Sequence, residues 1–154
     1  MYKKIMVPLD GSELAECVLP HVNAFIEGCN ISNVIFVRVV EPAEASHYGE
    51  ISISPVILEE AVSARKAAAR NYLDQIVNRH KHEGTELQSE VLVGRVTESL
   101  IDYAEKNDID LILIATHGRS GVTRWVRGSV ADRILRSANI PVLMVRAPGT
   151  EEGI

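Results

Sequence analysis

The sequence predicts an α/β protein with one open, doubly wound sheet of five parallel strands and helices on both faces. Two observations lead to this fold class. Short apolar runs alternate with longer segments of helical periodicity, which is the pattern of right-handed βαβ crossovers. The strand candidates are also apolar along almost their whole length, as in "DLILIAT" at 110–116, and this is typical of strands that helices cover on both faces.

Turn residues and changes of periodicity divide the chain into elements in the order βαβαβαβαβ. The predicted strands lie at 3–9, 33–40, 86–94, 110–116 and 141–146, and the predicted helices at 12–28, 55–82, 96–107 and 128–138.

Two of these helices carry distinctive residues. Pro20 lies within the helix at 12–28 and is expected to bend it, because proline removes one backbone hydrogen bond. Gly28 is expected near the end of the same helix. The helix at 55–82 is expected to pack through one face, which consists of Ile57, Ala61, Ala64, Ala68, Tyr72 and Ile76.

The chain has the length of one domain. Its 154 residues contain no repeat and no linker, so residues 1–147 are expected to fold as a unit. The polar segment at 41–54 is the best candidate for a long loop, and residues 148–154 form a polar tail.

Composition and charge argue against several classes of protein. The net charge of −5 and the pI near 5.5 provide no overall basic field that would attract nucleic acid. No apolar run approaches the roughly 20 residues that span a bilayer. The N-terminal "MYKKIMVPLD" lacks a signal-peptide pattern, so we expect a cytoplasmic protein with no membrane partner. Cys17 and Cys29 are too few for a disulfide scaffold and are expected to be reduced thiols.

A glycine-rich segment follows the predicted strand at 110–116 and leads into the last helix. Doubly wound sheets bind ligands outside the carboxyl ends of their strands, so this segment lies where a ligand is expected. Glycine lets backbone N–H groups approach a phosphate closely, and a helix N-terminus favours negative charge. The residues concerned are Gly118, Arg119, Gly121, Arg124, Arg127, Gly128 and Ser129.

Each of these residues also has a simpler interpretation. The glycines alone would turn the chain, Ser129 would cap the helix together with Asp132, and the arginines would form a solvated surface. Because the glycines and the serine occur together, phosphate binding is favoured for the set. The role of the arginines stays open.

Asp10 ends the first predicted strand in "PLDGSE" and has two interpretations of similar weight. It caps the following helix, with Glu13 three residues later, or it holds a ribose hydroxyl or a metal ion that rides on phosphates. His117 is a candidate base, but no nucleophile with an orienting acid accompanies it. The chain has neither GxxxxGK[ST] nor GxGxxG after the first strand, which argues against the Walker and dinucleotide motifs.

Three stretches of the sequence closely resemble the universal stress protein family: "IMVPLDGSELAE", "VGRVTESLIDYAEKNDIDLILIATHGRSG" and "RGSVADRILRSANIPVLMVR". The resemblance covers residues 2–146. The ATP-binding members of that family carry the pattern G-x2-G-x9-G-[ST], which Gly118, Gly128 and Ser129 match. Ala115 stands at the first glycine, and its methyl group is expected to crowd a bound nucleotide.

The resemblance implies strand order 3-2-1-4-5, in the adenine nucleotide alpha hydrolase-like arrangement, and a site for ATP, AMP or ADP. Mg²⁺ or Mn²⁺ would be held through the phosphates, with Asp10 as an indirect ligand. Val39 would contact adenine through its backbone. Together with loop residues from the segment above, the predicted site consists of Pro8, Leu9, Asp10, Val39, Ile114, Ala115, His117, Gly118, Arg119, Gly121, Gly128, Ser129 and Val130.

The resemblance also implies a homodimer in which the strand at 141–146 pairs antiparallel with its copy. A short apolar edge strand needs such cover. The sequence therefore predicts a dimeric, ATP-binding protein of stress response or signalling. The alternatives are a dimeric adaptor that works without nucleotide, and a weak ATPase that hydrolyses ATP or phosphorylates itself with Asp10 and a metal ion.

Overall fold

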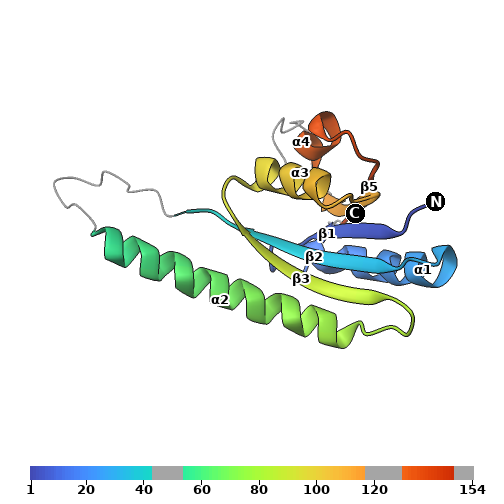
Figure 1. Ribbon diagram of the computed structural model, residues 1–154, viewed down its shortest axis with the longest axis horizontal. Coiled ribbons are helices and arrows are strands. Elements are labelled where there is room, and N and C mark those ends of the chain that lie inside the picture. The colour runs from blue at the N-terminus through green and yellow to red at the C-terminus, as the bar shows by residue number, and fades with distance from the viewer. Residues whose placement is uncertain (43–53, 117–129, 148–154) are drawn as a thin grey trace, which may run out of the picture.

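The computed structural model describes residues 1–42, 54–116 and 130–147 and shows the predicted fold class. Five parallel strands form one sheet in the order β3-β2-β1-β4-β5, which confirms the predicted strand order. Helices α1 and α2 cover one face of the sheet, and α3 and α4 cover the other (Figure 1). The elements are β1 (Lys4–Pro8), η1 (Ala15–Val18), α1 (Leu19–Cys29), β2 (Asn33–Val40), α2 (Pro55–Arg79), β3 (Glu86–Val93), α3 (Val96–Lys106), β4 (Leu111–Thr116), α4 (Val130–Ser137) and β5 (Val142–Arg146).

The central strand β1 divides two hydrophobic cores. Side chains alternate across a strand, so Ile5 and Val7 pack toward α1 and α2, whereas Met6 packs toward α3 and α4. All three are completely buried. The central strand is therefore covered on both faces, as its continuous apolar run predicts.

The predicted helix at 12–28 is wrong in its form. The structure has a 3-10 helix, η1, followed directly by α1, which begins at Leu19. Pro20 therefore lies in the first turn of an α-helix, where its missing N–H has no intrahelical partner to lose, instead of bending a longer helix. The helix ends at Cys29, so Gly28 lies near its end as predicted, and the left-handed residue that caps it is Asn30, with a φ of 52°.

The predicted face of the long helix α2 is also wrong. The helix buries Ala69, Leu73 and Ile76, so only Ile76 is shared with the prediction. Tyr72 is half-buried and Ile57 is 57% exposed. Figure 1 shows the reason: the N-terminal part of α2 extends past the ends of the strands, so its apolar residues have no sheet beneath them.

Three predicted features lie outside the described residues. They are most of the loop at 41–54, the glycine-rich segment at 117–129 and the tail at 148–154. None of the helices in the described ranges combines the length and the apolar character needed to span a bilayer.

A carboxylate and two lysines join the N-terminal end of the central strand β1 to the elements around it. Asp110 Oδ2 accepts hydrogen bonds from the backbone N–H groups of Lys3 and Lys4, both at 2.8 Å. Lys4 Nζ donates to the carbonyl of Asn107 at 2.8 Å, and Lys3 Nζ donates to that of Asn30 at 3.2 Å. The start of β1 is thereby joined to the ends of α1 and α3.

Removing the Asp110 carboxylate is expected to destabilise the fold. Asp110→Ala leaves two N–H groups at the start of β1 without their acceptor, which should lower the free energy of unfolding by about 2 kcal/mol. Asp110→Asn keeps one acceptor oxygen and should lose less. Chemical denaturation measures both, with Asp102→Ala, at an exposed position on α3, as the control. Equal stability of Asp110→Ala and the control would contradict this role.

Candidate functional site

The sheet opens where β1 and β4 stop pairing. These two strands share only the pairs Ile5–Leu111 and Met6–Ile112. The Lys4 carbonyl accepts a hydrogen bond from Asp110 N, directly before β4, at 2.9 Å. Because the N–H and carbonyl groups of a strand alternate in direction, the backbone of Pro8 points toward β4 as well. Proline has no N–H, so it cannot donate the next ladder hydrogen bond. The strands separate at the point where the strand order reverses.

Two backbone segments face this opening. The Val37 carbonyl accepts a hydrogen bond from Leu9 N at 2.8 Å, so the backbone of Val37 faces β1. The backbone N–H and carbonyl of Val39, two residues later, point to the same side of β2, but they lie past the end of β1. On β4, Ile112 N donates toward β5 at 2.9 Å. The groups of Ala115 therefore point the other way, toward β1. Val39 and Ala115 thus present an N–H and a carbonyl each to the space between the strands.

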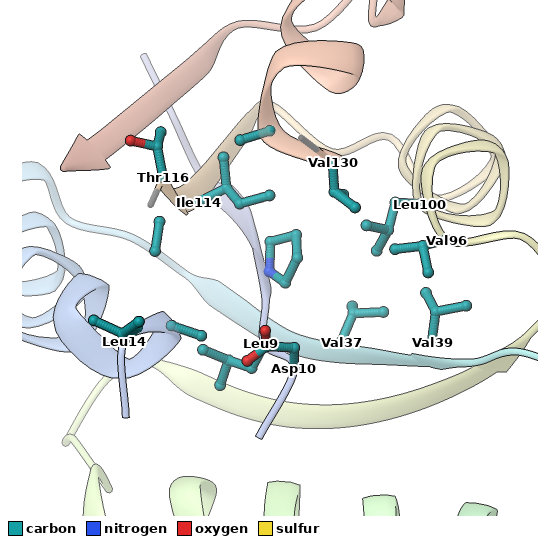
Figure 2. Close-up of a pocket in the computed structure, with 14 residues that line it drawn as sticks. Leu9, Asp10, Leu14, Val37, Val39, Val96, Leu100, Ile114, Thr116 and Val130 are labelled. Atoms are coloured by element: carbon teal, nitrogen blue, oxygen red, sulfur yellow. The ribbon is translucent and has the colours of Figure 1, made fainter. Parts of the chain in front are cut away.

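A cavity of about 400 Å³ lies at this opening (Figure 2). Its wall comes from the tips of β1, β2 and β4, from η1 and from the first turns of α3 and α4. The lining residues are Pro8, Leu9, Asp10, Leu14, Ala15, Val37, Val39, Val96, Leu100, Ile114, Ala115, Thr116, Val130 and Ala131.

The described wall has an apolar part and a polar part. Val37, Val39, Val96 and Leu100 lie together at one end, as Figure 2 shows. Asp10, which lies beside Leu9 in the same view, is the one charged side chain among the described lining residues, and Thr116, on the other side of the cavity, adds a hydroxyl. This arrangement suits a ligand with a flat apolar ring at one end and hydroxyl groups at the other.

Comparisons with known proteins identify the family of this chain. The model of the universal stress protein family matches residues 1–146. A relative from Methanocaldococcus jannaschii, universal stress protein MJ0531, is 31% identical over 158 residues, which cover 98% of this chain and 86% of that protein. The chain belongs to the universal stress protein family.

Solved structures show the same fold. That of MJ0577, a universal stress protein of the same organism, has a TM-score of 0.78 and 28% identity, covering 96% of this chain and 98% of that one. A more distant family protein from Arabidopsis thaliana, solved with AMP bound, has a TM-score of 0.62 and 16% identity, covering 95% of this chain and 92% of that one.

In this member of the family, a local turn orients Asp10. Asp10 Oδ1 accepts hydrogen bonds from Ser12 N at 2.9 Å and from Ser12 Oγ at 2.6 Å. Ser12 Oγ in turn accepts from Ala15 N at 3.1 Å, whereas no side chain caps η1 at its N-cap residue Leu14. The capping interpretation of Asp10 with Glu13 is therefore wrong. Ser12 Oγ accepts the hydrogen bond from the first N–H of η1, and Asp10 accepts hydrogen bonds from Ser12.

The structure brings the described part of the predicted site together. All of the predicted residues within the described ranges line the cavity: Pro8, Leu9, Asp10, Val39, Ile114, Ala115 and Val130. Their binding role stays a prediction. The other predicted residues, His117, Gly118, Arg119, Gly121, Gly128 and Ser129, lie outside the described residues.

Sequence reasoning missed half of the wall. Val37 was detectable in principle, because it shares a strand face with Val39. Val96 and Leu100 were not, because their place depends on how α3 packs over β2. The residues missed are Leu14, Ala15, Val37, Val96, Leu100, Thr116 and Ala131.

The described residues offer no metal centre of their own. No group of three or more His, Cys, Asp or Glu side chains in the described ranges is placed to hold an ion. Asp10 supplies one carboxylate, so a divalent cation here would need further oxygen ligands, such as the phosphates of a nucleotide.

Ala115 offers a direct test of the cavity wall. Ala115→Val adds bulk to the cavity wall on the face of the sheet that η1 and α1 cover, and should weaken binding of ATP, the predicted ligand, about tenfold or more, because overpacking costs about 1–3 kcal/mol. Ala115→Gly should tighten it by about threefold, because it removes a methyl group from the wall. Calorimetry measures both, with Ala24→Val, at an exposed position on α1, as the control. Unchanged affinity in both variants would place the ligand elsewhere.

Proposed function

We propose that this universal stress protein binds an adenine nucleotide, ATP in the first place, in the cavity between β1 and β4. One observation carries the proposal: a single cavity contains both the backbone of Val39, among apolar side chains, and the Asp10 carboxylate. The AMP bound by the distant family protein from Arabidopsis thaliana supports the class of ligand.

The base fits the apolar end. Adenine is flat and would pack between the side chains of β2 and those of α3, represented by the partly exposed Val39 and Val96. Its Watson–Crick edge carries the N1 acceptor and the N6 amino donor. The N–H and the carbonyl of Val39 complement this pair without the cost of burying a charged side chain.

The sugar and phosphates would follow in the opposite direction. A ribose hydroxyl donates well to a carboxylate, and Asp10 is the acceptor at that end. The phosphates would then reach toward the glycine-rich segment at 117–129. For this last part the support is the sequence pattern alone.

The proposed role is a nucleotide-dependent binding switch. Among the described lining residues Asp10 is the one carboxylate and Thr116 the one hydroxyl, and Figure 2 shows them on different sides of the cavity, which does not favour a base paired with a nucleophile. Occupancy would act by changing the surface around the cavity mouth for signalling partners. Any hydrolysis of ATP would be slow.

The test begins with the purified protein. Denaturation followed by mass spectrometry should release adenine nucleotide, and calorimetry on the emptied protein should show ATP binding. Asp10→Asn keeps the shape of the side chain but removes its charge, and should weaken binding about tenfold, because hydrogen bonds to charged groups contribute about 1.5–3 kcal/mol. If the protein releases no nucleotide and calorimetry shows no heat of binding at millimolar ATP, the proposal fails. That result would favour the dimeric adaptor that works without nucleotide.

We also propose a homodimer through β5. This strand lies at the edge of the sheet, and Leu143 and Met144 are 37% and 42% exposed. The Pro141 carbonyl and Ala147 N bond to β4, so by alternation the backbone of Met144 points to the free edge. A second copy, antiparallel across a two-fold axis, would pair with these groups.

Met144→Pro tests the dimer without disturbing β4. It removes an N–H that points outward, which an edge strand tolerates, and should convert the dimer into a folded monomer. Met144→Ala keeps the N–H and should remain dimeric. Size-exclusion chromatography with light scattering reports the mass. A monomeric wild-type protein, or a dimer that survives the proline, would contradict the interface.

A further inference from the structure

Arg38 packs against the Asp10–Gly11 turn from behind the cavity. It lies on β2 between Val37 and Val39, and alternation along the strand sends its side chain to the opposite face of the sheet from theirs. Gly11 has a φ of +86°, a conformation that residues with a side chain rarely adopt. A Cβ atom at Gly11 would lie 3.0 Å from Arg38 Nη1, 3.2 Å from Cζ and 3.3 Å from Nη2. These similar distances mean that the flat guanidinium faces the glycine.

The guanidinium packs against the ring of Tyr72, which is itself hydrogen-bonded. Its Cζ atom lies over the ring of Tyr72, 5.5 Å from the ring centre. The Tyr72 hydroxyl donates to Glu16 Oε1 at 3.0 Å, and Glu16 Oε2 lies 3.6 Å from Arg79 Nη2. Burial, followed by the hydrogen bond to Glu16, raises the pKa of Tyr72, so the hydroxyl remains a donor at all physiological pH values. Helix α2 and η1 thereby anchor the side chain that touches the turn.

The same turn sets the direction of the carboxylate that faces the ligand. Asp10 is held by the N–H and the hydroxyl of Ser12, one residue beyond Gly11. Arg38 itself does not line the cavity. A change at Arg38 therefore reaches a ligand through the position of the turn, apart from the long-range effect of its charge.

We infer that Arg38 is a positioning residue for sugar recognition: by bracing the Asp10–Gly11 turn on Tyr72, it makes the site select ribonucleotides over deoxynucleotides. The inference rests on the proposed adenine nucleotide site and assigns part of its specificity. The carboxylate can accept a hydrogen bond from a sugar hydroxyl only within a narrow range of distance and angle. A turn that shifts when its brace is removed would lose this bond first.

A simpler role for Arg38 makes a different prediction. A positive charge near an anionic nucleotide raises affinity whatever the sugar, and lysine would supply the same charge. Bracing needs the flat guanidinium, which lysine lacks. The ratio of affinities for ribose and deoxyribose ligands therefore separates the two roles, because a pure charge effect cancels in the ratio.

The experiment measures affinity for ATP, 2′-deoxy-ATP and 3′-deoxy-ATP by calorimetry. Wild-type protein should prefer ATP over at least one deoxynucleotide by about tenfold or more, as expected for a lost hydrogen bond to a carboxylate. Arg38→Leu and Arg38→Lys should both reduce this preference to about twofold. Arg70→Leu is the matched control: it removes an exposed arginine of α2 that donates to the Ser89 carbonyl at 3.4 Å, far from the turn in the sequence.

A milder variant covers the case in which Arg38→Leu does not fold, which circular dichroism would show. Tyr72→Phe keeps the ring under the guanidinium but removes the hydroxyl bond to Glu16, and should lower the preference by about threefold. Its affinity for the deoxynucleotide should stay that of the wild type.

Three results overturn the inference. The first is a wild-type protein that binds ATP and both deoxynucleotides equally. The second is an unchanged preference in both Arg38 variants. The third is a wild-type preference in Arg38→Lys, with all three ligands equally weakened in Arg38→Leu, which would assign Arg38 a charge role. If the wild-type protein binds none of the three ligands, the proposed function itself fails.

Discussion

The site depends on the end of one hydrogen-bond ladder. As far as Met6 and Ile112, β1 and β4 pair like any two parallel strands. At Pro8 the next donor is missing, and the two strands, each continued by pairing with its other neighbour, separate. The backbone groups of Val39 and Ala115 are left facing the gap. The polar groups that a ligand needs thus come from the sheet itself, and the surrounding side chains can remain apolar.

Much of this arrangement could be predicted because it follows from local rules. Continuous apolar strands and alternating periodicity define the sheet, and the position of a switch point follows from its topology. Asp10 could be placed at a strand end on that basis, whereas the strand order and the role of Ala115 came from the family resemblance. The helices were harder: the prediction for α2 failed because apolar periodicity does not reveal where the underlying sheet ends, and the part of α2 that contains Ile57 lies beyond it.

The contacts across elements could not be predicted at all. Val96 and Leu100 enter the cavity wall only because α3 packs against β2, and Arg38 meets Gly11 only because three elements converge on one turn. These contacts join residues far apart in the sequence, and one sequence provides no constraint on their distance. Pro20 shows a related limit, since its effect depends on whether it falls inside a helix or in its first turn.

The rigidity of the wall restricts how a ligand can influence partners. Behind the cavity, Ile5, Met6 and Val7 of β1 are completely inaccessible, so the proposed nucleotide would meet no loosely packed core to rearrange. A ligand shifts an equilibrium only through contacts that differ between two states. In the described part of the chain, we expect such contacts at the rim, where Leu14 is 44% exposed beside the turn of Asp10. A nucleotide that covers this leucine would change the apolar surface offered to a partner while leaving the fold unaltered.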